Sequence, residues 1–124
     1  MTERALILVA HGSPDPDWRR PLERLVELLA VELGDAVAVA YLAHAPSIEA
    51  VIASFEQAGH QRVLVVAALL SPGGRHVKQD IPDAVAAARA RFPSVEIELA
   101  PGALGDDEQV LAALARASLE RLTR

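Results

Sequence analysis

The order of apolar and polar positions along the chain predicts strands that alternate with helices. Four short segments have the pattern of strands: residues 5–10, 36–42, 63–70 and 95–99. The first three are apolar at almost every position, which is typical of parallel strands covered on both faces. The fourth alternates apolar and acidic residues, so we expect an edge strand with one face in water.

In the stretches between these strands, apolar residues recur at intervals of three and four, as they do along one face of a helix. The predicted helices begin between residues 17 and 21, at residue 48, at residue 81 and at residue 106. Gly34, Gly59 and Pro93 are expected to end the first three, because glycine and proline stop helices. Asp80 is the expected N-cap of the third helix.

Consecutive strand–helix units predict an α/β fold, a flavodoxin-like three-layer domain with a four-stranded parallel sheet. Right-handed crossovers leave few topologies, and the strand order 2-1-3-4 is the leading one. The length of 124 residues fits a single domain, residues 1–124. In this order the first and third strands are neighbours, and the loops after them lie over one crevice. Open α/β sheets bind ligands at this carboxyl edge.

Histidines follow the predicted strands at this edge. His11 directly follows the first strand, and His76 lies in the loop after the third. Two imidazoles that converge there favour a divalent metal site with open coordination positions. The alternative is that each is a loop histidine satisfied by local hydrogen bonds. His44, after the second strand, is a weaker candidate ligand, and His60 is placed at the opposite edge, on the surface.

Cations flank the same loop. Arg75 and Lys78 lie beside the start of the third helix, where we expect them to bind an anion. Arg19 and Arg20 follow the first loop and are interpreted as members of solvated charge pairs.

Composition excludes several classes of function. The formal net charge is −5 and aromatic residues make up 3% of the chain, which argues against nucleic-acid or anionic membrane surfaces. The longest apolar runs are far shorter than a membrane helix of about 20 residues. No cysteine is present, so thiolate metal sites are excluded and a reducing cytoplasm is the expected location. No P-loop or dinucleotide-binding glycine motif is present.

Two segments resemble a known family. His11-Gly12-Ser13 and residues 69–82, with the pattern Gly-x-His-Val-x-x-Asp-Ile-Pro, resemble the short-form sirohydrochlorin chelatases, the CbiX-type class II cobaltochelatases and ferrochelatases. The resemblance covers essentially the whole chain. It implies a chelatase-like fold and ATP-independent insertion of Co²⁺, or of Fe²⁺, into sirohydrochlorin in cobalamin or sirohaem biosynthesis. The metal is then a substrate, no cofactor is permanently bound, and His11 and His76 are the catalytic metal ligands.

The chain departs from the family pattern at two places. Many relatives have a glutamate after the second strand, where this chain has Ala43-His44, and a histidine in the last loop, where it has Asp106-Asp107. The third ligand, the proton acceptor and the preferred metal therefore stay open, with His44 as a candidate. Sirohydrochlorin is a polycarboxylate, so a cationic rim is expected. The candidate substrate-binding residues are Gly12, Ser13, Ser71, Gly73, Gly74, Arg75 and Lys78.

One four-stranded domain provides half of the wall needed to enclose a flat macrocycle, and class II relatives use two such domains, so we expect a homodimer. Two alternatives stay open. The first is a non-enzymatic metallochaperone or tetrapyrrole carrier that uses the same crevice. The second is a flavodoxin-like module that binds a phosphate or a flavin at the loops after the first and third strands.

Overall fold

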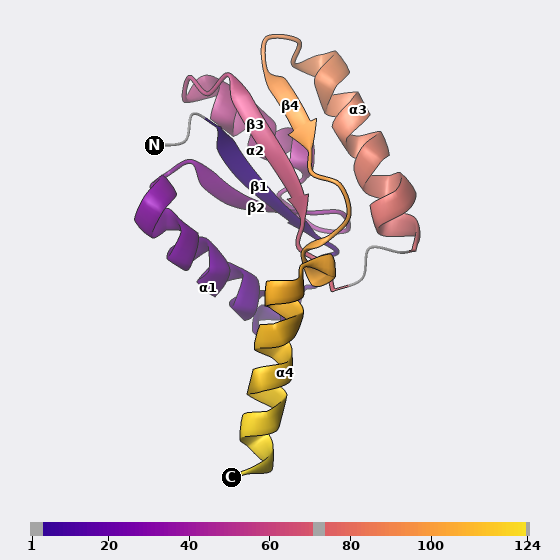
Figure 1. The fold of residues 1–124 in the computed structure, drawn as a ribbon. Coiled ribbons are helices and arrows are strands. Elements are labelled where there is room, and N and C mark those ends of the chain that lie inside the picture. Colours follow the sequence, from indigo (N-terminus) through magenta and orange to yellow (C-terminus); the bar gives the residue numbers. More distant parts are fainter. Residues whose placement is uncertain (1–3, 71–73, 124) are drawn as a thin grey trace.

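The computed structural model describes residues 4–70 and 74–123. Its centre is a parallel sheet with the strand order β2-β1-β3-β4 (Figure 1). The strands are β1 (Ala5–Ala10), β2 (Val37–Tyr41), β3 (Arg62–Ala67) and β4 (Glu96–Leu99). The predicted α/β architecture, the strand order and the edge position of the fourth strand are confirmed.

Helices lie on both faces of this sheet. The long helices are α1 (Pro16–Leu33), α2 (Ile48–Gln57), α3 (Ile81–Arg91) and α4 (Glu108–Leu122). A π-helical turn, η1 (His76–Asp80), precedes α3, and a short 3₁₀ turn, η2 (Leu104–Asp106), precedes α4. Helices α2 and α3 contact each other on one face, whereas α1 covers the other face (Figure 1).

The core lies under α2 and α3. The side chains of Val63, Val65 and Ala67 on β3 are completely or almost completely buried there, against helix residues such as Ile52 and Ile81. The alternate residues of β3, Leu64 and Val66, are only half-buried. The expectation that this strand is covered on both faces is therefore wrong for its second face. The reason is that α4 does not pack on the sheet but extends away from it (Figure 1).

The start of the third helix also differs from the prediction. Asp80 has helical backbone angles and no capping hydrogen bond, because η1 runs directly into α3. Pro82 has no N–H to donate, and in a regular α-helix its ring would clash with the carbonyl one turn earlier. The wider π-helical turn of η1 avoids this clash. The helical segment thus begins near Arg75, several residues before the predicted start at residue 81.

The other predicted helix boundaries agree closely. Asp15 caps α1 by accepting from the Asp17 N–H at 2.9 Å, so the helix begins just before the predicted range. Gly34 ends α1, and Ser47 caps α2. Among the described residues, no helix is both long enough and apolar enough to span a bilayer.

Candidate active site

The loops after β1, β2 and β3 meet at the carboxyl edge of the sheet, as predicted. The Ala43 N–H donates to the His11 carbonyl at 2.8 Å, which joins the loop after β1 to the loop after β2. On the other side of β1, the Ala68 N–H donates to the Val9 carbonyl at 2.8 Å. The loop that carries His11 therefore lies between the chains that leave β2 and β3.

Gly12 brings His44 close to the His11 loop. Its φ is +104° and it is buried. A Cβ at this position would lie 3.0 Å from His44 Cδ2 and 3.0 Å from Tyr41 Cβ, so both side chains pack directly on the glycine. His11 and His44 are both exposed to solvent. The structure thus places the weaker of the sequence candidates next to His11, and its role as a ligand stays a prediction.

The segment after β3 is described in part. Ser71 and Gly73 lie outside the described residues, and so does the side chain of His76, whose backbone belongs to η1. Gly74 has a φ of +86° with open space where a Cβ would be, so here the glycine serves the turn. Among the described side chains, no group of at least three histidine or acidic residues converges on a metal position.

The cations of this segment are accessible. Lys78 is exposed, and the side chain of Arg75 is 79% exposed while its Nε lies 3.4 Å from Asp80 Oδ1. An ion pair this exposed contributes little to stability. Arg75 is therefore able to leave Asp80 and pair with another carboxylate. Ser13 contributes locally, because its Oγ accepts from the Asp15 N–H at 3.1 Å in the turn before α1.

The loop after β4 holds the end of β3 in place. The Gly105 N–H donates to the Leu69 carbonyl at 2.9 Å. A Cβ on Gly105 would lie 1.5 Å from the Leu70 carbonyl oxygen, so no other residue fits without moving the backbone. This contact fixes the direction in which the chain leaves β3 toward η1. The sequence contained one sign of it, the Leu104-Gly105 pair after the last strand.

Tyr41 is a site residue that sequence reasoning missed. It is buried, and its ring centroid lies 6.3 Å from that of Trp18. Burial raises the pKa of the Tyr41 hydroxyl, Glu23 raises it further, and Arg19 partly opposes both. The phenol is therefore a neutral donor and acceptor beside the candidate site.

The two arginines of α1 differ from each other. Arg20 forms an exposed ion pair with Asp17, as expected. Arg19 is instead half-buried, and its Nε is buried with no hydrogen-bond partner among the described residues. The interpretation of Arg19 as a solvated surface charge is therefore wrong for its Nε, which the surrounding residues bury.

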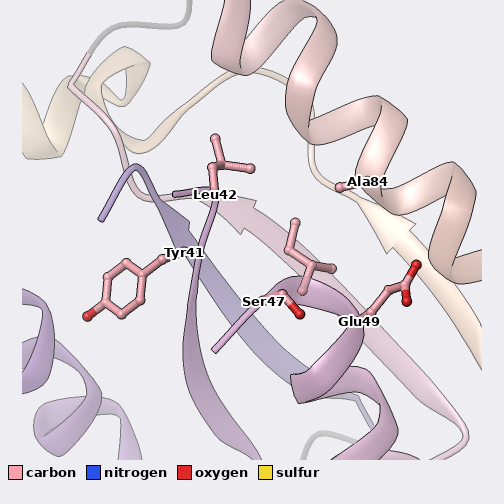
Figure 2. A pocket seen from close by; sticks show the side chains of 6 residues that line it. Tyr41, Leu42, Ser47, Glu49 and Ala84 are labelled. Atoms are coloured by element: carbon pink, nitrogen blue, oxygen red, sulfur yellow. The ribbon is translucent and has the colours of Figure 1, made fainter. Parts of the chain in front are cut away.

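Shallow hollows surround these loops. One of 550 Å³ is lined by the loop after β2, residues 41–47, and by Ala50. A second, of 230 Å³, lies between the end of β2, the start of α2 and α3, with the side chains shown in Figure 2: Tyr41, Leu42, Ser47, Ile48, Glu49 and Ala84. The carboxylate of Glu49 in this hollow pairs with Arg91 at 2.9 Å. These open, mostly apolar surfaces suit the contact of one edge or face of a large ligand.

The parallel sheet and its histidine-bearing carboxyl edge are features of a class of α/β proteins that bind ligands at this edge. The sequence matches the CbiX family over residues 5–121, so the chain belongs to the CbiX family. No curated protein sequence matches it.

Solved structures agree with this membership. One is assigned as a cobalamin (vitamin B12) biosynthesis CbiX protein from Marinobacter aquaeolei VT8. It is 28% identical with a TM-score of 0.84, over 98% of this chain and 96% of that one. A second is the sirohydrochlorin chelatase SirB from Bacillus subtilis subspecies spizizenii in complex with cobalt, 26% identical with a TM-score of 0.80, over 96% of this chain and 51% of SirB. A third is SirB from Bacillus subtilis with Fe3+, 26% identical with a TM-score of 0.78, over 93% of this chain and 46% of SirB. This chain thus spans about half of each SirB chain.

Proposed function

We propose that this protein is a sirohydrochlorin chelatase that inserts a divalent metal into the macrocycle without ATP. Co²⁺ is the favoured substrate and Fe²⁺ the second. Membership of the CbiX family and similarity to SirB chains that hold cobalt or iron support the proposal. One observation carries it for this chain: β1 and β3 are adjacent, so His11 and His76 follow neighbouring strands at one edge.

In this proposal His11 and His76 hold the incoming ion. Imidazole binds borderline divalent ions, and two ligands leave positions open for the macrocycle nitrogens. An ion held by few protein ligands is released readily into the ring. An imidazole can also accept a pyrrole proton near neutral pH. His44, packed on Gly12, replaces the glutamate of other family members as third ligand or proton acceptor.

The rim of the site binds the carboxylates of sirohydrochlorin. Arg75 and Lys78 are exposed beside the first helical turn after β3, where the helix dipole also favours anions. Charge-assisted hydrogen bonds from a guanidinium orient a carboxylate more strongly than neutral donors do. Backbone and hydroxyl groups complete the proposed substrate-binding set: Gly12, Ser13, Ser71, Gly73 and Gly74.

We further propose that residues 1–124 act as a single chelatase-like domain in the cytoplasm, paired as a homodimer. A hollow of 550 Å³ at the carboxyl edge is open, which supports a site that a second domain completes.

An anaerobic absorbance assay tests the function. Sirohydrochlorin is mixed with Co²⁺, Fe²⁺ or Ni²⁺, with and without protein, and the rate of spectral change is measured. His11→Ala and His76→Ala should each reduce the rate by about tenfold or more, equal to about 1.4 kcal/mol of barrier, while macrocycle binding stays close to wild type. His44→Ala should also slow insertion if His44 is the third ligand or base.

His60→Gln is the matched control, because His60 lies near Phe55 at the opposite edge of the sheet. Normal rates for both the His11 and the His76 variants would contradict the assigned roles. Binding of the macrocycle by a wild-type protein that has no turnover would identify a carrier instead.

A further inference from the structure

Trp18 is a partly exposed aromatic side chain at the carboxyl edge of the sheet. It lies in the first turn of α1, two residues after the helix begins at Pro16, and it is 41% exposed. It is the single tryptophan of a chain in which aromatic residues make up 3%. An indole combines a large apolar area with a flat π-face, and both are available here to a ligand at this edge.

Tyr41 connects the indole to the loops of the candidate site. The ring centroids of Trp18 and Tyr41 are 6.3 Å apart, with an interplanar angle of 55°. Figure 2 shows the ring of Tyr41 directed away from the other side chains of the hollow beside α2 and α3. At its base, the Cβ of Tyr41 lies 3.0 Å from the position that a Cβ on Gly12 would take, and His44 packs on the same glycine. Tyr41 therefore holds the indole beside the loops after β1 and β2.

The charges of this helical turn suit an anionic ligand. The carboxylate of Asp15 accepts the capping hydrogen bond from the Asp17 N–H, and Asp17 is paired with Arg20. Arg19 directly follows Trp18, and its Nε is buried with no hydrogen-bond partner among the residues that the structure describes. A positive charge thus lies next to a flat apolar face. Both features match a planar macrocycle that carries carboxylates.

We propose that Trp18 stacks on the outer part of one face of the macrocycle, and that Tyr41 positions the indole for this contact. The inference rests on the proposed function and adds a substrate contact to it. The proposed cationic rim, Arg75 and Lys78, belongs to the segment before α3, whereas α1 covers the opposite face of the sheet. Contacts from both sides would fix the orientation of the ring over His11. Offset stacking of aromatic rings is favourable at centroid distances of about 4.5–7 Å.

A purely structural role for Trp18 makes different predictions. In that role the indole only covers the buried ring of Tyr41, and another apolar side chain of similar size would serve as well. Leucine at position 18 keeps an apolar cover and removes the π-face, whereas phenylalanine keeps an aromatic face. Comparison of these two variants therefore separates stacking on a ligand from cover of Tyr41.

Binding of uroporphyrin I, a planar tetrapyrrole polycarboxylate, tests the inference without turnover. Trp18→Leu should weaken the affinity by about tenfold, and Trp18→Phe by no more than about threefold. The loss in Trp18→Leu should be equal at low and high salt, because stacking is not an interaction between charges. Val31→Ala is the matched control, since Val31 is 84% exposed near the other end of α1. Wild-type affinity in a Trp18→Leu variant that is folded by circular dichroism, or no binding by the wild type, would overturn the proposal.

Hydroxyl-radical footprinting of the wild-type protein needs no substitution. Bound uroporphyrin I should lower the oxidation of Trp18 by at least about threefold relative to that of Leu28, because the macrocycle covers the indole. Leu28 is 54% exposed on the same helix and serves as the internal reference. An unchanged ratio would overturn the proposal. Protection of Trp18 in a protein that inserts no metal would refute only the proposed function, and metal insertion without this protection would refute only the stacking contact.

Discussion

Replacing Gly12 with alanine should destabilise the protein through two separable effects. The first is the backbone, because a φ of +104° is a conformation that residues with a Cβ rarely adopt. The second is space, because the new Cβ would lie 3.0 Å from atoms of His44 and of Tyr41. An ordinary carbon–carbon contact is about 3.5–4.0 Å, so both side chains must move.

Gly59→Ala measures the backbone effect alone. Gly59 has a φ of +93° and nothing within 4 Å of the position that a Cβ would take. Strained backbone of this kind costs about 1–3 kcal/mol. Gly12→Ala should add an overpacking cost of about 1–3 kcal/mol. The free energy of unfolding should therefore fall further in Gly12→Ala than in Gly59→Ala, by about 1–3 kcal/mol.

Urea unfolding followed by the fluorescence of Trp18, the single tryptophan, measures both variants. The chelation rates of the two folded variants are then compared with that of the wild type. Gly12→Ala should lower this rate because His44 is displaced, and Gly59→Ala should leave it unchanged. Equal free energies of unfolding in the two variants would refute the packing of His44 and Tyr41 on Gly12.

Two further predictions concern charge and pH. Replacing Arg75 and Lys78 together with alanine should weaken sirohydrochlorin binding by about tenfold and more at low salt, with metal binding unchanged. Arg24→Ala on α1, which breaks an exposed pair with Glu27 at 3.2 Å, is the control. An unchanged affinity in the double variant would show that Arg75 and Lys78 are solvated surface charges that do not bind the macrocycle. The raised pKa of Tyr41, caused first by burial, keeps its phenol protonated in the folded protein at pH values where the unfolded chain ionises. Its contribution to stability should therefore be complete below about pH 10 and decline above it. Urea midpoints across this range should fall less in Tyr41→Phe than in wild type, and the same decline in both would contradict the argument.

The sequence by itself determined the architecture and which loops share the carboxyl edge of the sheet. Apolar runs separated by helical repeats specify which segments are strands and which are helices, because burial of each element requires that periodicity. Right-handed crossovers then leave few strand orders. His11 and the loop that leads to η1 could therefore be assigned to neighbouring strands without coordinates.

Only the tertiary structure decided how the loop residues meet and where α4 points. His44 lies on Gly12, and the Nε of Arg19 is buried, because backbone angles and packing across distant segments set these contacts. No local pattern encodes them. The position of α4, which extends away from the sheet, likewise depends on contacts that periodicity does not specify (Figure 1).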